Sequence, residues 1–439
     1  MSVHAQAAFW AAVYLALTVT PLAVLLLAPT PAKGGFWWEV GIGLGFAGLT
    51  MMAIQFVLTA RFRIAVAPFG IDVIYYFHRY MAYLLVIAVL VHPVLLVAVD
   101  PSLLDRINPL SATWAMQSGV AASVLLLALI ASSVGRKQLR IPYGLWRPLH
   151  LALAIGAIAL AFAHMKAIGY YSAVPALQAL WVAIGASLGA IVITVRIVRP
   201  WLLSRRPYRV DNIASEPGDA WTLTLTPEGH AGFTFEPGQF AWVSLGHSPF
   251  TLQEHPFTIM SAPAADGSLA FTIKALGDFT ATVGDIAPAT RVYVDGPYGA
   301  FSIDRHADAL GYVFIVGGIG VTPALSMLAA LAERGDRRHH VLFAAHGQWD
   351  RVPCRDRLIA LQSRLDLDAV HVLEHPPADW PGEHGMLTAA LLDRHLPAAR
   401  ARYEYFICGP RPMTQAVEHA LHALHIPVAR MHTELFDMA

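Results

Sequence analysis

The stretch "FHRYMAYLLVIAVLVHPV", from Phe77 to Val94, is almost wholly apolar and yet holds two histidines, His78 and His92. A helix needs about 20 mostly apolar residues to cross a bilayer, and the apolar run around this stretch, residues 72–98, is long enough. Ionisable side chains inside a membrane are costly and mark functional positions. The stretch therefore predicts a membrane-spanning helix that carries two functional imidazoles.

Further apolar runs fill the N-terminal half of the chain. The 439 residues are 56% hydrophobic and only 14% charged, which is too apolar for an ordinary soluble protein. The first run has no basic segment before it and no clear cleavage site, so we do not interpret it as a removable signal peptide. We expect a six-helix bundle over residues 1–204 with the lipid bilayer as its partner, the other five spans being roughly 8–28, 37–60, 113–134, 146–168 and 173–199.

Basic residues predict how this bundle is oriented. Cytoplasmic loops of membrane proteins carry an excess of Lys and Arg. With six spans, the loops and ends on one side hold Arg61, Arg63, Arg136, Lys137, Arg140, Arg147, Arg205, Arg206 and Arg209. The other side has little beyond Lys33, Arg106 and Lys166. We expect a multi-pass protein of a cell inner membrane with both termini in the cytoplasm.

The fifth span repeats the histidine spacing of the third. His150 and His164 are 14 residues apart, as are His78 and His92. Fourteen helical residues bring a side chain back to within about 40° of its first direction, roughly 21 Å further along. Because the third and fifth spans run the same way, His78 is expected to face His150 near the cytoplasm. His92 is expected to face His164 near the outer surface.

Two axial imidazoles at each of two sites suit low-spin haem in electron transfer. Each helix would supply one metal ligand to each of two b-type haems. A proton relay and a transition-metal site are the alternatives, and neither explains the repeated spacing. Arg79 and Arg147 flank the cytoplasmic pair, where they would bind haem propionates or serve as positive-inside anchors.

The composition changes after about residue 205. Residues 205–306 alternate apolar and polar positions between Gly and Pro turns, which predicts an antiparallel β-barrel. Residues 307–439 read as strands alternating with helices, which predicts a parallel α/β domain. The net charge of zero argues against a nucleic-acid partner. Two cysteines, Cys354 and Cys408, are too few for a disulfide framework.

A glycine turn opens the α/β domain. The sequence "IVGGIGVTPALSML" places Gly317, Gly318 and Gly320 between a strand and a helix. Glycine lets a ligand approach the backbone, and a helix N-terminus favours a phosphate. Thr322 is expected to cap the helix and Pro323 to fit its first turn. An ordinary strand-to-helix turn is the alternative, since the standard dinucleotide fingerprint GxGxxG is not met.

The order of these short motifs resembles a known family. "HPFT", "IK" with a following Gly and Thr, "GPYG", "GGIGVTP" and "CGP" resemble the ferredoxin–NADP reductase family over about residues 206–439. The paired-histidine spans resemble the ferric reductase-like transmembrane domain over about residues 60–200. Together they resemble the NADPH oxidase and ferric-chelate reductase superfamily, and "HPFT" is typical of its membrane branch.

The resemblance implies roles for individual residues. The flavin ring and ribityl chain of FAD would be held by His255, Pro256, Phe257 and Thr258. Its pyrophosphate and adenine side would be lined by Ile273, Lys274, Gly277 and Thr280. The nicotinamide dinucleotide would lie on Gly317, Gly318, Gly320, Thr322 and Pro323. The nicotinamide ring would lie beside Cys408, Gly409 and Pro410. Phe436 would stack on the flavin, although three residues follow it here, and Cys408 would otherwise be a buried small hydrophobe.

The implied activity is transmembrane electron transfer from cytosolic NADPH or NADH through FAD and two haems to an outer-face acceptor. O2 giving superoxide is favoured, although the extra histidine of animal NADPH oxidases is replaced here by Leu96. An Fe(III) chelate, a periplasmic or membrane protein partner, and a redox-sensing b-type cytochrome stay open. His346, Arg351 and Arg355 follow the second strand of the α/β domain, where they would bind the 2′-phosphate of NADPH or would simply be surface charges.

Overall fold

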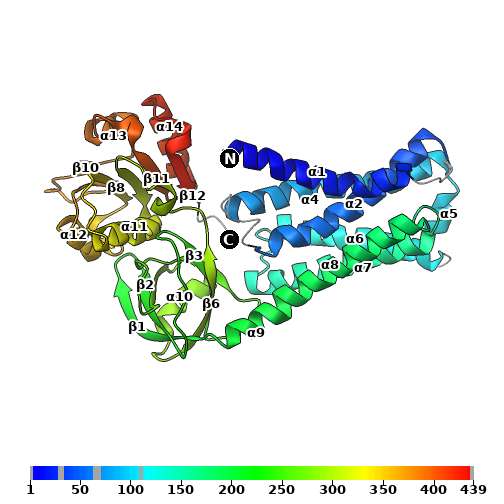
Figure 1. Ribbon diagram of the computed structural model, residues 1–439, viewed down its shortest axis with the longest axis horizontal. Coiled ribbons are helices and arrows are strands. Elements are labelled where there is room, and N and C mark those ends of the chain that lie inside the picture. Colours follow the sequence, from blue (N-terminus) through cyan, green and yellow to red (C-terminus); the bar gives the residue numbers. More distant parts are fainter. Residues whose placement is uncertain (1–2, 28–33, 63–70, 108–111, 436–439) are drawn as a thin grey trace. The chain divides into compact units, whose positions relative to one another are not determined.

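The computed structural model describes residues 3–27, 34–62, 71–107 and 112–435 (Figure 1). The chain forms two compact units whose main boundary lies between Arg199 and Pro200, and the first two residues of α4, Ile71 and Asp72, group with the second unit. Lys33, Arg63 and Phe436, three residues that the sequence singled out, lie outside the described residues.

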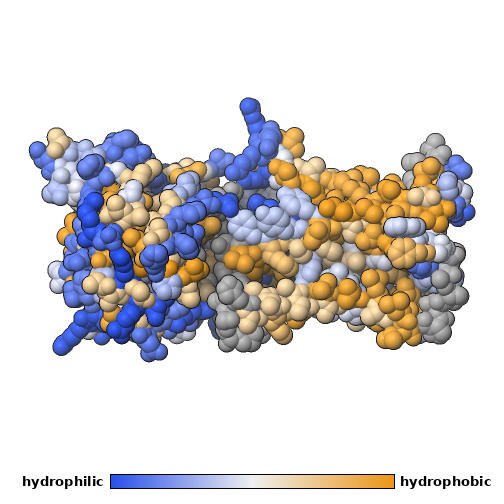
Figure 2. All heavy atoms as spheres, turned by 90° about the horizontal axis from the view of Figure 1, so that it is seen from above, coloured by the Kyte–Doolittle hydropathy of each residue, from blue (hydrophilic) through white to orange (hydrophobic). Residues whose placement is uncertain are grey.

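Long apolar helices make up the first unit, and six of those described are long and apolar enough to cross a membrane, as predicted. Figure 2 shows hydrophobic side chains over much of the visible surface of the helical part. A short π-helical stretch, η1 (Thr194–Val198), continues the last span into α9 (Arg199–Ser204). The other helices are α1 (Val3–Leu27), α2 (Phe36–Thr59), α4 (Ile71–Val99), α5 (Leu103–Ile107), α6 (Trp114–Val134), α7 (Tyr143–Ile168) and α8 (Pro175–Ile193).

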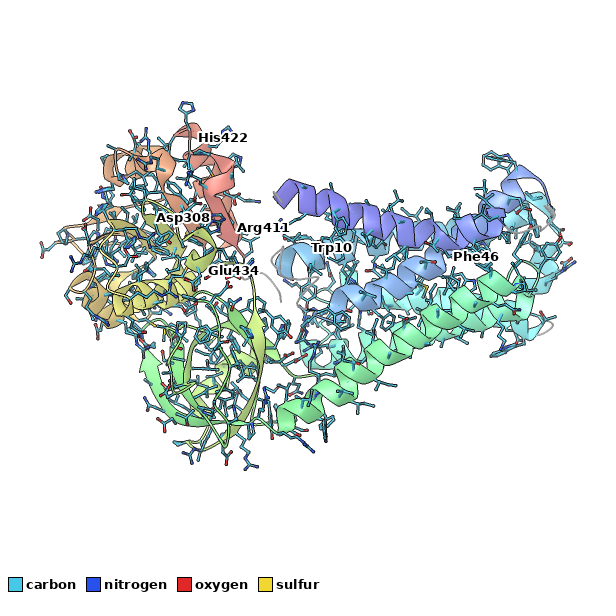
Figure 3. All side chains as sticks on the ribbon, in the orientation of Figure 1. Trp10, Phe46, Asp308, Arg411, His422 and Glu434 are labelled. Atoms are coloured by element: carbon cyan, nitrogen blue, oxygen red, sulfur yellow. The ribbon has the colours of Figure 1, made fainter. Side chains whose placement is uncertain are left out.

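Helix α2 forms the core of this unit. Its sequence "GIGLGFAG" (residues 41–48) is rich in small residues, which let membrane helices approach closely. Phe46, labelled in Figure 3, is buried, as is Leu49. The ring centroid of Phe46 lies 5.8 Å from that of Trp181 in α8. Helices α6 and α7 also pack closely along their lengths, whereas α4 and α7 do not approach each other as closely.

The second unit begins with an antiparallel sheet in the order β4-β3-β6-β1-β2-β5. The N–H of Met260, just after β4, donates to the carbonyl of Ala270 in β5 at 2.7 Å, so the two edges meet and the sheet curls into the predicted barrel. Its elements are β1 (Tyr208–Glu216), β2 (Ala220–Pro227), β3 (Phe240–Leu245), β4 (His255–Thr258), β5 (Leu269–Lys274), α10 (Asp278–Ala281), η2 (Val283–Asp285), β6 (Arg291–Tyr298) and η3 (Ile303–His306).

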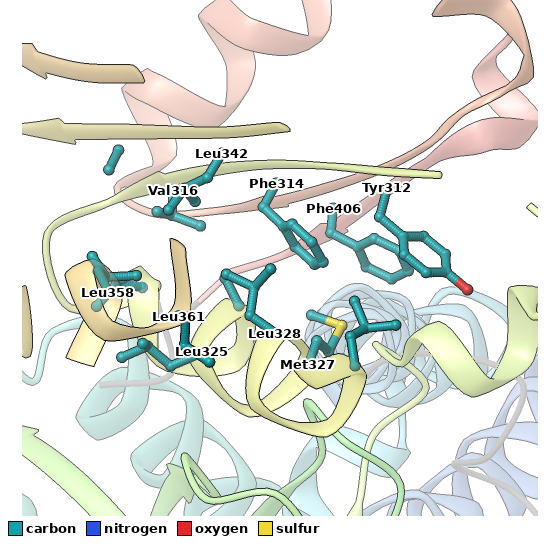
Figure 4. Packing of buried hydrophobic residues seen from close by; sticks show 14 of the residues in the cluster. Tyr312, Phe314, Val316, Leu325, Met327, Leu328, Leu342, Leu358, Leu361 and Phe406 are labelled. Atoms are coloured by element: carbon teal, nitrogen blue, oxygen red, sulfur yellow. The ribbon is translucent and has the colours of Figure 1, made fainter. Parts of the chain in front are cut away.

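A parallel sheet in the order β10-β9-β8-β7-β11-β12 follows, as the alternation of strands and helices predicted. Phe314 and Leu328 belong to the apolar core between the sheet and α11 (Figure 4). The elements are β7 (Tyr312–Gly317), η4 (Gly318–Gly320), α11 (Val321–Glu333), β8 (His340–His346), η5 (Trp349–Arg351), α12 (Arg355–Gln362), β9 (Leu367–Leu373), β10 (Glu383–His384), α13 (Ala389–His395), η6 (Arg400–Arg402), β11 (Glu404–Cys408), α14 (Arg411–Ala423), η7 (Val428–Arg430) and β12 (Met431–Glu434).

Candidate functional site

The structure brings the outer pair of histidines together. The ring centroids of His92 in α4 and His164 in α7 lie 6.5 Å apart, with their planes at 79°. Two imidazoles on one metal ion, each with a bond of about 2 Å and a ring centre about 1 Å beyond the bonded nitrogen, have centres roughly 6 Å apart. The observed separation therefore fits a pair of axial ligands to one metal ion.

Hydrogen bonds leave the Nε2 atoms of this pair free to act as ligands. Nδ1 of His92 lies 2.7 Å from the carbonyl oxygen of Gly41 in α2, and Nδ1 of His164 lies 2.6 Å from that of Ala115 in α6. A carbonyl oxygen only accepts, so each imidazole donates from Nδ1 and keeps the lone pair on Nε2. This is the arrangement by which proteins orient metal-binding histidines.

Two glycines make room for these rings. A Cβ at Gly45 of α2 would lie 2.9 Å from Nδ1 of His92, and a Cβ at Gly119 of α6 would lie 2.6 Å from Nδ1 of His164. Any side chain there would collide with the imidazole. The cradle and the donor set of this outer pair fit a haem.

The inner pair is supported by the same two neighbouring helices. His78 and His150 lie within electrostatic range of each other. Nδ1 of His150 lies 3.0 Å from Oγ of Ser133 in α6, and the Gln55 side-chain amide in α2 donates to the backbone carbonyl of His78 at 3.2 Å. Nδ1 of His78 and Oε1 of Gln55 are both buried without a hydrogen-bond partner. Burying polar atoms without a partner is unfavourable, so Nδ1 of His78 and Oε1 of Gln55 are expected to find a hydrogen-bond partner in the functional state.

Sequence reasoning did not identify the residues that support the four histidines. Helix α2 supports the histidines of α4, and α6 supports those of α7. One signal was available, because Gly41 and Gln55 are 14 residues apart, like the histidines that they contact. The other residues that support the histidines are Gly45, Ala115, Gly119 and Ser133.

The two arginines expected near the inner pair lie on the same helices as its histidines, Arg79 directly after His78 in α4 and Arg147 three residues before His150 in α7. Arg79 is exposed, and its guanidinium carbon lies 5.6 Å from the ring centroid of Tyr76. Arg147 is half-buried and follows Trp146, whose ring centroid lies 5.0 Å from that of His150.

Strand β4 carries the HPFT motif at the edge of the barrel sheet. Oγ1 of Thr258 is buried and has no hydrogen-bond partner, as expected of a hydroxyl that binds a polar ligand. The ring of His255 stacks on Phe279 with centroids 3.9 Å apart and planes at 14°, and the Phe257 ring lies 6.4 Å from Phe279. Phe279 is an aromatic neighbour that sequence reasoning missed.

The other residues expected at FAD have local structural roles. Ile273 is buried in the barrel core, so its side chain is not available to a ligand. Lys274 ends β5. Oγ1 of Thr280 accepts from the N–H groups of Leu276 and Gly277, each at 2.9 Å, and so holds the turn before α10.

The nucleotide-site glycines lie where the strand order of the parallel sheet changes direction. Strands β7 and β11 are neighbours, and ligands of such sheets bind beyond the carboxyl ends of the strands at this point. A Cβ at Gly320 would lie 2.4 Å from the Cys408 carbonyl, so this glycine allows the two turns to pack. Gly318 has a φ of +55° and open space at its Cβ, which leaves its backbone accessible.

The predicted helix cap is wrong. The N-cap of α11 is Gly320, which has no side chain with which to cap the helix. Thr322 lies inside the first turn, where its hydroxyl donates to the carbonyl of Ile319 at 3.0 Å. Pro323 lies in the first turn, as predicted. The N–H of Val321, the first residue of α11, donates to the Gly318 carbonyl, so α11 continues directly from η4.

Cys408 lies at the end of β11 and is fully buried. Burial and then the nearby Glu434 raise the pKa of this thiol well above its usual range, so the thiol stays protonated at neutral pH. Glu434 is opposite Cys408 in the β11–β12 register and was not identified from the sequence. Gly409 follows, where a Cβ would lie 2.6 Å from Cε of Met413, and Pro410 is the N-cap of α14.

The three candidates for a 2′-phosphate site differ in the charge that they offer. Burial, followed by the nearby His371, lowers the pKa of His346 to about 4, so its ring is neutral at pH 7. The guanidinium of Arg351 already forms an ion pair with Asp219. That of Arg355 lies 5.3 Å from the centroid of the Trp349 ring.

Family profiles match three separate parts of the chain. A ferric reductase like transmembrane component matches residues 44–162, an FAD-binding domain matches residues 208–302, and an oxidoreductase NAD-binding domain matches residues 314–419. The first range covers His78, His92 and His150 and ends two residues before His164, and the other two cover the barrel and most of the parallel sheet.

Similar curated proteins match about half of the chain. The stachydrine N-demethylase reductase subunit Stc4 of Rhizobium meliloti is 33% identical over 221 residues, which are 49% of this chain and 62% of that protein. The propane 2-monooxygenase reductase component of Rhodococcus jostii is 31% identical over 228 residues, which are 50% and 60%. The chain thus spans about three-fifths of these relatives. A flavohemoglobin structure from Malassezia yamatoensis has 19% identity and a TM-score of 0.49, covering 77% of this chain and 91% of its own.

Proposed function

We propose that this chain moves electrons from cytosolic NAD(P)H across a membrane to O2. Its matched domains make it an NAD(P)H-dependent flavin oxidoreductase of the NADPH oxidase-like ferric reductase superfamily. The product is superoxide. One NAD(P)H releases two electrons and one proton on the inner side, and two O2 molecules each take one electron on the outer side. We assign residues 1–204 to the haem-binding bundle in an inner membrane, 205–306 to the FAD domain and 307–439 to the nucleotide domain, the last two in the cytoplasm.

The observation that carries this proposal is the outer pair, His92 and His164, with centroids 6.5 Å apart and both Nδ1 atoms bonded to carbonyls. A proton relay needs histidines that exchange their Nδ1 protons, whereas these protons are held by acceptors on other helices. The inner pair His78 and His150 lies on the same two helices, one spacing away. Two sites along one pair of helices form a route across the membrane.

The protein's own residues position the reactants. When bound, FAD turns a hydride into single electrons and the haems pass these electrons on. The open backbone at Gly318, in the turn that leads into α11, receives the dinucleotide phosphates. The protonated thiol of Cys408 and the carboxylate of Glu434 border the nicotinamide position. The buried hydroxyl of Thr258 donates to or accepts from the flavin.

A small neutral acceptor fits the outer end of the bundle. Glu39, in the first turn of α2, accepts a hydrogen bond from the hydroxyl of buried Tyr171 at 2.5 Å. Its carboxylate is therefore already engaged by the protein, whereas an iron(III) site relies on oxygen and nitrogen ligands that are free to bind it. O2 needs no such ligands and would accept electrons near the His92 and His164 pair.

Electron donation to a protein partner is the second candidate. The curated relatives are named as reductase subunits or components of a demethylase and of monooxygenases. In this reading, a periplasmic or membrane protein replaces O2 as the outer acceptor.

The test is cytochrome c reduction by purified protein loaded with haem and FAD, with NADPH or NADH, in air. Superoxide dismutase is expected to suppress most of the signal. His92→Ala is the matched variant, which should abolish the dismutase-sensitive signal while the flavin is still reduced. Reduction that the dismutase leaves unchanged would reject O2 as acceptor, and the search would move to ferric chelates and protein partners.

A further inference from the structure

Three side chains converge at the end of the parallel sheet away from the nucleotide turns. Glu404 is the first residue of β11, His432 lies in β12, and His306 ends η3, the short helix between the barrel and the sheet. Their possible ligand atoms all lie within 4.8 Å of one another. Cys408 is at the opposite end of β11, so this cluster takes no part in the hydride path.

The geometry of the three donors is close to that of a metal site. Oε2 of Glu404 lies 2.9 Å from Nε2 of His432 and 3.9 Å from Nδ1 of His306. In a tetrahedral zinc site the ligand atoms are roughly 3.3 Å apart. To bind one ion, the His306 and His432 ligand atoms, now within 4.8 Å of each other, would approach by up to about 1.5 Å, with a rotation of the His306 ring. The ion would take the place of the hydrogen bond between His432 and Glu404.

The surroundings also suit a metal ion. Nη1 of Arg430 lies 2.6 Å from Oε1 of Glu404, which holds the carboxylate so that Oε2 faces the imidazoles. Ligating carboxylates are usually held in this way by a further hydrogen bond. The ring of Phe406, 5.1 Å from that of His432, forms an apolar floor.

The site is open to solvent. The side chains of His306, His432 and Glu404 are 29%, 20% and 10% exposed, so an ion can enter and keep a water ligand.

We propose that His306, Glu404 and His432 bind one divalent transition-metal ion, and that zinc suits this set of two imidazoles and one carboxylate. The ion fastens the segment between the two domains and the C-terminal strand to the central sheet. Strand β12 ends at Glu434, beside Cys408. The metal therefore steadies the strand that borders the nicotinamide position, independently of the haem sites.

The test uses the full-length protein in detergent, without a polyhistidine tag, stripped with a chelator and titrated with zinc chloride. Calorimetry and elemental analysis are expected to give one zinc per chain, and cobalt(II) should give the absorption bands of a tetrahedral site. Loss of one ligand should weaken zinc binding at least about tenfold in His432→Ala and Glu404→Gln. Bound zinc should raise the temperature at which FAD is released.

His422→Ala is the matched control, because His422 is an exposed histidine on the neighbouring α14 (Figure 3). It should bind zinc as the unmodified protein does. The FAD content of each variant checks that it is folded. If a ligand variant does not fold, His306→Gln, at the most exposed of the three ligands, takes its place. Zinc binding that is the same in the ligand variants and in the control, or no zinc in the unmodified protein, would overturn the proposal.

Discussion

Gly119 of α6 provides the space that the imidazole of His164 in α7 occupies, since a Cβ at residue 119 would lie 2.6 Å from Nδ1 of that ring. Nδ1 also lies 2.6 Å from the Ala115 carbonyl, one helical turn earlier in α6. The ring is thus held by one turn of a neighbouring helix, which sets its tautomer and its direction together.

Replacing Gly119 with Ala should therefore displace His164 and weaken the outer haem. We expect the ratio of haem to FAD in the purified protein to fall from two towards one, measured by the haem pyridine spectrum and flavin absorbance. Gly185→Ala in α8 is the matched control, because a Cβ there has nothing within 4 Å. Equal haem content in both variants would contradict the role of Gly119 in making room for the His164 ring.

Removing an outer ligand should separate the two halves of the electron path. In His92→Ala we expect one haem per chain and unchanged reduction of FAD by NAD(P)H under anaerobic conditions. Stopped-flow absorbance would follow the flavin and the remaining haem. Two haems per chain in this variant would rule out the pairing of His92 with His164.

Gln55 should support the inner ligand His78. Its side-chain amide donates to the His78 carbonyl, and its Oε1 is buried without a partner, as is Nδ1 of His78. Because this amide holds the backbone of His78, Gln55→Leu should shift the reduction potential of one haem and leave the other unchanged. Gln178→Leu, on the exposed face of α8, is the control. A potentiometric titration unchanged from that of the control would reject this role.

Acidification should destabilise the nucleotide domain through His340. This side chain is fully buried, and its Nδ1 accepts from the N–H of Tyr312 at 3.3 Å. Burial lowers its pKa to about 4 from an ordinary 6.5. The unfolded chain therefore takes up a proton below pH 6.5 that the folded chain refuses, so stability is lost as the pH falls from 6.5 towards 4, on the order of 3 kcal/mol in all.

Thermal release of FAD between pH 7 and pH 5 would measure this loss. His340→Leu should make the release temperature less dependent on pH, whereas His384→Leu, at an exposed position, should keep the original dependence. Identical slopes in the two variants would contradict the assignment to His340.

The second unit should work without the membrane domain. A fragment of residues 205–439 is expected to fold, bind FAD and reduce ferricyanide with NAD(P)H, because the barrel and the parallel sheet each have their own buried core. Haem should be absent from it. A folded fragment that does not bind FAD would show that the flavin site needs the helical unit.

The sequence alone determined the six spans, the histidine spacing and the change from barrel to parallel sheet. Each depends on a local pattern: a run of about 20 apolar residues, a helical repeat, or alternating polarity. The sequence wrongly predicted Thr322 as the cap of a helix, because α11 begins at Val321, one residue before Thr322. Element boundaries depend on packing as well as on the residue itself.

Only the tertiary structure decided which groups support the reactive residues. Gly41 and Gln55 reach the histidines of α4, and Glu434 lies beside Cys408, although these partners are far apart in the chain. Such pairs depend on which helix packs on which and on the order of strands in a sheet. A glycine and a backbone carbonyl have no sequence signature for this role, because their contribution is the space and the acceptor that they place next to another element's side chain.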